Sequence, residues 1–261
     1  MRPFLLLLLL LINLPTIAQN KTIGTNEKLV FTASYNMSGL LTDLAQVTME
    51  TSEIKTSSST LLRLKCRAQT YTKWDNFFKI NDLYESYVGA NSLRPYLYKR
   101  EINEGGYYKF MQYKYDRKSG QVQSLMRKRA KVGGFYEVKD NLRIGSESID
   151  LVALIYHIRN LDIHKAGNGS SDTFSVLFDS KENPVTITLL GTETIDTAIG
   201  EKSCYKLSIA LNNSDVLKGK NSNLLWLTAD NNKIPVYAKF KVAVGSGELR
   251  IKSASGLKHS I

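Results

Sequence analysis

Polar and apolar residues alternate along most of this chain with the period of two that is typical of β-strands. Between residues 29 and 35 the odd positions are Leu, Phe, Ala and Tyr and the even ones are Val, Thr and Ser, which places one set on a buried sheet face. Similar runs predict further strands at residues 44–54, 61–72, 80–88, 95–103, 106–116, 121–129, 134–139, 172–179, 184–190, 192–197, 202–211, 223–229, 234–244 and 247–252.

Short clusters of turn-forming residues separate these runs. Gly105-Gly106, the segment Asp116–Gly120 and Gly133-Gly134 each supply residues that tolerate positive φ between strands. Asn231-Asn232 and Gly245-Ser246-Gly247 are expected to form the last two hairpin turns. The order of strands and tight turns predicts an antiparallel meander.

One segment follows a helical period instead. Leu151, Leu154, Ile155 and Ile158 fall at i, i+3, i+4 and i+7, which predicts a helix over residues 149–161. Either Ser148 or Asp150 can cap its first turn by accepting a hydrogen bond from a free backbone N–H. The fold expected is all-β and mainly antiparallel, as a large meander β-barrel or a strongly curved sheet with one short helix.

Four strings of the chain resemble an exported bacterial family, domain-of-unknown-function family 3108. The strings are Asn26–Leu29, Asn81–Val88, Asp150–Tyr156 and Leu225–Val236, and they occur in the expected order over nearly the whole chain after residue 18. The resemblance implies export and a mainly antiparallel fold, with a large meander barrel of the kind called YmcC-like. It implies no catalytic residues.

The first 18 residues are typical of a cleavable signal peptide. A positive charge at Arg2 precedes the leucine run Leu5–Leu11, and small residues at Thr16 and Ala18 mark a cleavage site. The apolar run is well short of the roughly 20 residues of a membrane-spanning helix, and no cysteine is placed to accept lipid. We therefore expect a single soluble domain, residues 19–261, in the periplasm.

Positive charge is concentrated in the middle of the chain. Residues 94–143 contain 13 basic and 5 acidic side chains, so they carry +8 of the whole-chain charge of +11. Such a surface suits anionic partners, and export favours anionic lipids or glycans of the envelope over nucleic acid. The candidate ligand-binding residues are the interleaved tyrosines and basic residues Tyr96, Tyr98, Arg100, Tyr113, Tyr115, Arg117, Arg127, Lys128 and Arg129.

A second interpretation of the same residues needs no ligand. Strands commonly alternate outward Lys and Arg with inward Tyr, because tyrosine fits a half-buried sheet face and basic residues discourage aggregation between sheets. Cys66 and Cys204 also have two interpretations. They can form a disulfide that closes a long loop in an oxidising compartment, or they can be buried free thiols.

The sequence contains no recognisable catalytic or metal site. The histidines, His157, His164 and His259, are too scattered to share a metal ion, and two cysteines without nearby histidines do not make a zinc site. Asp82 and Glu85 are expected on opposite strand faces, which disfavours a pair of catalytic carboxylates. We expect no cofactor and no enzymatic activity.

Three functional hypotheses remain. The first is a binding or carrier module that holds an apolar or amphipathic envelope molecule in the mouth of the barrel. The second is a scaffold in an envelope assembly, for which a filled interior and an exposed apolar patch would be evidence. The third is a glycan hydrolase with an unrecognised site.

Overall fold

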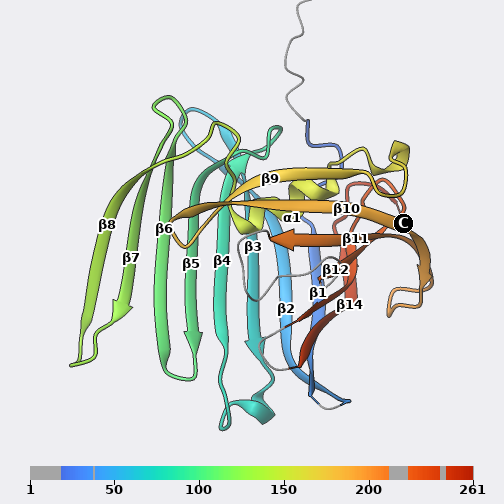
Figure 1. Cartoon of the computed structure of the whole chain (residues 1–261), viewed down its shortest axis with the longest axis horizontal. Helices are drawn as coiled ribbons and strands as arrows, with labels where there is room; N and C mark the ends of the chain where they lie inside the picture. The colour runs from blue at the N-terminus through green and yellow to red at the C-terminus, as the bar shows by residue number, and fades with distance from the viewer. Residues whose placement is uncertain (1–18, 38, 212–222, 242–244, 261) are drawn as a thin grey trace, which may run out of the picture.

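The computed structural model describes residues 19–37, 39–211, 223–241 and 245–260 (Figure 1). The signal peptide expected at residues 1–18 lies outside this part of the chain. The strands are β1 (Lys28–Met37), β2 (Leu40–Lys55), β3 (Thr60–Thr70), β4 (Asn81–Gly89), β5 (Pro95–Glu104), β6 (Tyr107–Asp116), β7 (Gln121–Arg129), β8 (Phe135–Arg143), β9 (Ser171–Phe178), β10 (Lys181–Ile195), β11 (Lys202–Leu211), β12 (Leu224–Thr228), β13 (Pro235–Lys241) and β14 (Ser246–Ser255).

All fourteen strands belong to one antiparallel sheet. Its spatial order is β8-β7-β6-β5-β4-β3-β2-β1-β14-β13-β12-β11-β10-β9, so each strand pairs with its neighbour in sequence and β1 pairs with β14. The meander predicted by the turn clusters is therefore confirmed. The connection between β5 and β6, for example, places Gly105 and Gly106 at φ of 51° and 89°, a conformation that favours glycine.

The described chain contains one α-helix, α1 (Leu151–Arg159), and two short 3-10 helices, η1 (Thr72–Trp74) and η2 (Ile163–Lys165). The Asp150 carboxylate caps α1 by accepting hydrogen bonds of 2.9 Å from the backbone N–H groups of Val152 and Ala153. The helix packs against β3, β4 and β9, so its apolar residues fill the inside of the curved sheet. The expected helix is confirmed, with two residues fewer at each end.

The sheet is strongly curved and open, because β8 and β9 at its two ends do not pair with each other. Figure 1 shows β9 and β10 running crosswise over β3–β6. Contacts of the β9–β10 turn hold this crossing in place: the Asp179 side chain forms ion pairs with Arg100 and with Lys109, and the Ser180 backbone N–H donates to the Tyr113 hydroxyl at 2.9 Å. Of the two architectures expected, the structure has the strongly curved sheet.

Two details differ from the sequence-based expectations. The runs at 184–190 and 192–197 form one strand, β10, in which the register of pairing with β11 shifts between Leu189 and Gly191. A bulge changes which side faces the core, so the alternation looks interrupted in the sequence although the strand continues. Asn231 and Asn232 lie between β12 and β13 as expected, whereas Ser246 and Gly247 of the expected last turn belong to β14. Residues 242–244 lie outside the described residues.

Candidate functional site

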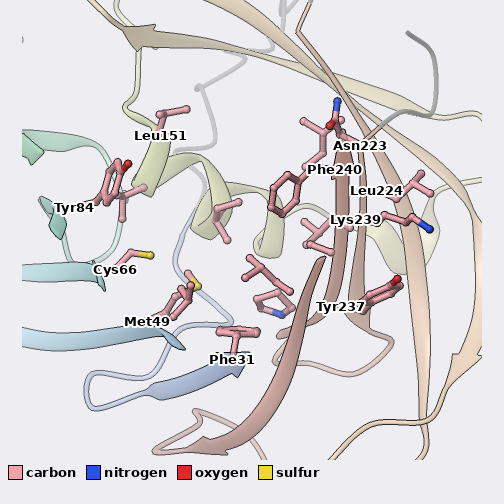
Figure 2. A pocket seen from close by; sticks show the side chains of 18 residues that line it. Phe31, Met49, Cys66, Tyr84, Leu151, Asn223, Leu224, Tyr237, Lys239 and Phe240 are labelled. Carbon is pink, nitrogen blue, oxygen red and sulfur yellow. The ribbon is translucent and has the colours of Figure 1, made fainter. Parts of the chain in front are cut away.

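An apolar cavity of about 310 Å³ lies between α1 and the concave face of the sheet (Figure 2). One wall is formed by β1–β4, with Phe31, Val47, Met49, Cys66 and Tyr84. The opposite wall comes from β11–β14 and the residue before β12, and α1 contributes the third side; these residues are Leu151, Val152, Ile155, Ile209, Asn223, Leu224, Leu225, Pro235, Tyr237, Ala238, Lys239, Phe240 and Leu249. The volume lies within the range of small-molecule sites.

Asn223 is a buried polar residue in this mostly apolar lining. Its side chain is 5% exposed, and neither its amide nitrogen nor its amide oxygen has a hydrogen-bond partner within the described chain. Figure 2 shows Asn223 beside Phe240 and Leu224 at one end of the group of lining residues. A buried amide without partners costs free energy, so this group is available to bond a polar atom of a ligand.

Cys66 and Cys204 are both free thiols, which agrees with the second of the two interpretations above. Cys66 lines the cavity, where burial raises the pKa of its thiol to about 12. Cys204 is fully buried elsewhere in the core, and burial raises the pKa of its thiol to about 11. Both thiols therefore stay protonated at neutral pH and react slowly.

Three of the tyrosines expected to bind a ligand are buried in the protein core. Tyr98, Tyr113 and Tyr115 are at most 7% exposed, and the Tyr98 and Tyr113 rings stack with centroids 5.6 Å apart. Burial raises the pKa of the Tyr98 and Tyr115 hydroxyls well above the usual value. The Tyr113 hydroxyl accepts a hydrogen bond from the β9–β10 turn, and the Tyr98 ring packs on Tyr113, so these rings belong to the core. Tyr115 lies beside Arg117, whose guanidinium is 4.6 Å from the centre of its ring.

Arg100 also lies inside, at 3% exposure, where it forms the ion pair with Asp179 and stacks over the Phe178 ring at 4.6 Å. Burial opposes ionisation of Asp179, but hydrogen bonds from Lys109 and Arg100 hold its pKa below the usual value. Arg117 is partly buried and donates to the backbone carbonyls of Pro95 and Ser148 at 3.1 and 2.9 Å. These two cations are used within the fold.

The remaining candidates lie on the surface but do not form one face. Tyr96 is half exposed, at the start of β5. In β7, Arg127 pairs across the sheet with Glu137 and forms an ion pair with it, and Arg129 pairs with Phe135. Lys128 lies between them and points to the other face, because successive strand residues alternate. The basic cluster of the sequence is thus divided between two faces of the sheet.

The other residues considered from the sequence have separate partners. Asp82 accepts a hydrogen bond of 2.9 Å from the Asn103 N–H, whereas Glu85 is bound to Arg63. Burial raises the pKa of Asp82 to about 6. His157 contacts the Leu93 carbonyl at 3.1 Å, and His259 contacts the Lys21 carbonyl at 2.8 Å. No group of three or more metal-ligating side chains occurs in the residues that were described.

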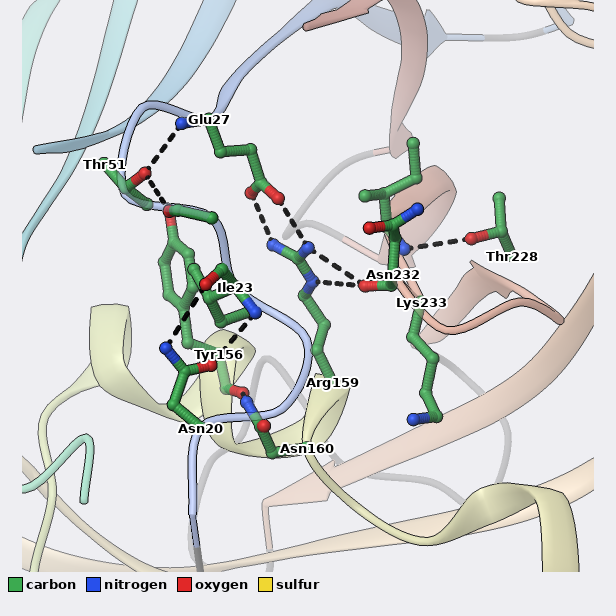
Figure 3. Close-up of polar contacts among 12 residues, drawn as sticks. Asn20, Ile23, Glu27, Thr51, Tyr156, Arg159, Asn160, Thr228, Asn232 and Lys233 are labelled. Carbon is green, nitrogen blue, oxygen red and sulfur yellow. Dashed lines mark hydrogen bonds and ion pairs between the residues drawn. The ribbon is translucent and has the colours of Figure 1, made fainter. Parts of the chain in front are cut away.

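A fully buried ion pair joins the end of α1 to the residue before β1, and no sequence pattern predicts it. Figure 3 shows Arg159 forming two hydrogen bonds with the Glu27 carboxylate, at 2.6 and 2.7 Å, and two more with the Asn232 carbonyl. Both side chains are at most 1% exposed. The two charges are 132 residues apart in sequence, so only the tertiary fold brings them together.

A second buried charge lies at the other end of the helix. Besides capping α1, Asp150 accepts a hydrogen bond of 2.6 Å from the Ser86 hydroxyl on β4. Burial raises the pKa of the Asp150 carboxyl to about 6, although the hydrogen bonds from Ser86, Ala153 and Val152 act in the opposite direction. Together, Asp150 and Arg159 hold both ends of the helix that forms one side of the cavity.

Comparison with solved structures shows the fold alone, because the identities are low. A β-barrel-like protein of the family DUF1849 from Brucella abortus is similar with a TM-score of 0.54 and 6% identity, over 92% of this chain and 100% of that one. A protein from Bacteroides fragilis described as having a YmcC-like fold is similar with a TM-score of 0.34 and 6% identity, over 91% and 99%. No curated protein matches this chain.

Within the described residues, no helix is both long and apolar enough to cross a membrane. A family model matches residues 30–252, which include all of β2–β13 and most of β1 and β14. The chain therefore belongs to the family described as "Protein of unknown function (DUF3108)".

Proposed function

We propose that this protein is an exported, non-enzymatic binding or carrier protein of the bacterial envelope that holds a lipid-like molecule in the cavity beside α1. The observation that carries this proposal is the combination of an apolar cavity of about 310 Å³ with one buried, unpartnered amide, Asn223. Apolar walls with few polar groups are typical of small-molecule binding sites, in which the polar group fixes the orientation of the ligand. A lipid-like molecule suits this lining better than a glycan, which needs many hydrogen bonds.

The basic residues of β7 do not line the cavity. The cavity is lined by strands β1–β4 and β11–β14, whereas Arg127, Lys128 and Arg129 lie three strands beyond β4. Among the described residues of the lining, Lys239 is the one cation, and its ammonium group lies 3.7 Å from the Glu248 carboxylate. Because this charge is already paired, a neutral polar head group suits the site better than an anion.

The decisive experiment measures bound lipid in the native protein and dye binding by wild type and two variants. Organic extracts of natively purified protein are analysed by mass spectrometry, and binding of the neutral apolar dye N-phenyl-1-naphthylamine is followed by fluorescence. We expect a bound lipid and saturable dye binding. A Cys66→Phe variant places a large ring in the cavity and is expected to lower dye affinity at least about tenfold.

The matched control is Ala68→Phe, which adds the same ring to the same face of β3, two residues along the strand, at a residue that does not line the cavity. This variant should bind the dye as wild type does. An empty native protein together with equal dye binding by both variants would contradict the proposal.

A scaffold in an envelope assembly is the second candidate. It is favoured by exposed apolar side chains on β8, where Phe135 and Val138 are 57% and 46% exposed. Pull-down from envelope extracts with a Phe135→Ser variant as control tests this role. A partner that is captured by the wild type and lost from the variant would support it.

A further inference from the structure

Exposed apolar side chains gather at one edge of the sheet, where four hairpin connections lie in a row. Of the ten large hydrophobic residues that are exposed in the described chain, eight belong to the β1–β2, β3–β4, β5–β6 and β7–β8 connections or to the strand residues next to them. We call this row the hairpin edge; Figure 1 shows its four connections along the lower border of the sheet. Its most exposed members are Leu40, Phe77 and Val132, at 72%, 87% and 96%.

Each hairpin of this edge contributes apolar groups. The first supplies Leu40 and Leu41, the second Phe77 and Phe78, the third Tyr107 and the fourth Val132, with Phe135 and Tyr136 at the start of β8. The opposite edge differs: its β2–β3 connection is Thr56-Ser57-Ser58-Ser59, and Tyr96 is the exposed large hydrophobic residue nearest to that side. Single exposed apolar residues are ordinary, but their concentration at one border marks an interaction surface.

Contacts between neighbouring hairpins make the edge continuous. The Trp74 indole N–H donates to the Asp43 carbonyl at 2.8 Å, which ties the second connection to β2. Phe78 lies against Gly105 of the third connection, where an added Cβ would come within 2.5 Å of the ring. Tyr108 and Phe135 meet edge to face at 5.3 Å, which joins the third hairpin to the fourth. The aromatic groups are therefore held in place along the border.

The hairpin edge is also basic. The segments 71–80, 103–108 and 128–136 contain five Lys or Arg and two Asp or Glu, which leaves three positive charges. Lys73 lies 5.4 Å from the centre of the Trp74 ring. Rings and aliphatic side chains with adjacent cations are the combination that enters the interface of a bilayer, where apolar groups reach the acyl boundary and cations meet lipid phosphates.

We infer that the hairpin edge docks onto the surface of an anionic lipid bilayer. Neighbouring connections are two strands apart, so at about 4.8 Å per strand the four hairpins extend over about 29 Å along the curved border. Four separate tips at this spacing suit a broad surface better than the pocket of a protein partner. Docking there would leave both α1 and the cavity free.

The test is flotation of the full chain with vesicles made of equal parts phosphatidylglycerol and phosphatidylcholine, and with vesicles of phosphatidylcholine alone. We expect binding to the anionic vesicles that weakens as salt is added. The double variant Phe77→Ser/Val132→Ser should bind at least about tenfold more weakly, because two apolar side chains no longer enter the interface. Arg129→Gln and Lys131→Gln, which each remove one positive charge, should weaken binding by about fivefold per residue.

Tyr96→Ser is the matched control, since it removes an exposed aromatic ring away from the hairpin edge. It should bind vesicles like wild type. In a second measurement, brominated lipids should quench the emission of Trp74 at the edge, and Trp74→Phe should abolish the quenching, because the other tryptophan, Trp226, is 4% exposed.

Three results would overturn the inference: no binding to anionic vesicles, equal binding by Phe77→Ser/Val132→Ser and wild type, or capture at this edge of a protein instead of lipid. Dye binding in the cavity is measured on the same variants. Because none of the edge residues lines the cavity, failure of the edge variants to affect vesicle binding leaves the proposed ligand function untouched.

Discussion

One cross-strand row of residues runs from the centre of the sheet to its β8 end. The row is buried at the centre and exposed to solvent at β8. Strand pairing aligns Leu29, Met49, Cys66, Tyr84, Arg100, Met111, Met126 and Val138 on the concave face. Leu29 is fully buried and Met111 is 2% exposed, whereas Val138 is 46% exposed. Backbone pairing is the same along the row, so what differs is the cover that α1 and the β9–β10 turn give to its central part.

This difference shows that residue type alone does not decide what a charged or aromatic strand residue does. Arg100 and Arg127 both come from the basic middle of the chain. Arg100 lies under the β9–β10 turn and is 3% exposed, while Arg127 lies on a hairpin that is open to solvent. Arg100 is buried in contacts that stabilise the fold, whereas Arg127 lies on the surface. Equivalent substitutions in the two regions should therefore lower the free energy of unfolding by very different amounts.

The largest effect is expected from Arg159→Met in the covered region. This change leaves the Glu27 carboxylate buried without its cation, so the free energy of unfolding should fall by about 3 to 5 kcal/mol. Urea denaturation followed by circular dichroism measures it. The matched change Arg127→Met removes the cation of an exposed ion pair, the one with Glu137, and should leave the free energy of unfolding nearly unchanged. Equal losses in the two variants would break the comparison.

A smaller effect concerns the pH dependence of stability, through Asp150. Its pKa is about 6 in the folded chain and near 3.8 when unfolded, so between about pH 4 and pH 6 the unfolded chain ionises first. The free energy of unfolding should therefore fall as pH rises through this window, by about 3 kcal/mol. Asp150→Asn keeps a capping oxygen but has no carboxyl to titrate, so its free energy of unfolding should not fall over this pH range.

Asp150→Ala separates the charge from the cap. It should also lose the pH-dependent fall but be less stable than Asp150→Asn by about 1 kcal/mol at every pH, because the helix N-terminus loses its acceptor. Urea unfolding at pH 4, 5, 6 and 7 measures both. If the free energy of unfolding of wild type and of Asp150→Asn changed with pH in the same way from pH 4 to pH 7, the Asp150 carboxyl would not titrate in this range.

The smallest of the three effects is expected at the boundary between the two regions. Asp179→Asn removes the charge that faces Arg100 and Lys109, and because Asp179 is half exposed the cost should be about 1 to 2 kcal/mol. Asp179 has a φ of 46°, which asparagine tolerates, so the turn itself is preserved. Hydrogen exchange of the Ser180 amide, which donates to Tyr113, should become faster.

Asp116→Asn is the control for this change, since it alters an exposed turn between β6 and β7 that has no buried cation as partner. It should leave both urea stability and exchange at Ser180 unchanged. If Asp179→Asn behaved in the same way, side-chain contacts would not be what holds β9 and β10 across β5 and β6.

Much of the fold could be predicted, whereas little of the candidate site could. Period-two alternation located the strands, and the stripe from Leu151 to Ile158 located α1, because both patterns depend on local geometry. The bulge at Gly191 hid the continuity of β10. The cavity joins residues from β1 and β14, and Asn223 has no sequence feature that distinguishes it from other asparagines, so neither could be found from spacing along the chain.

The sequence by itself determined the all-β class, the antiparallel order and the single described α-helix, since hydrophobic periodicity and turn residues act between near neighbours. Only the tertiary structure decided that the sheet curves without closing, that Tyr98, Tyr113, Tyr115 and Arg100 face inward, and that exposed apolar residues gather at the hairpin edge. Burial depends on which distant segment covers a strand, and the ion pairs Glu27–Arg159 and Arg100–Asp179 form across 132 and 79 residues. Local sequence patterns do not predict such contacts.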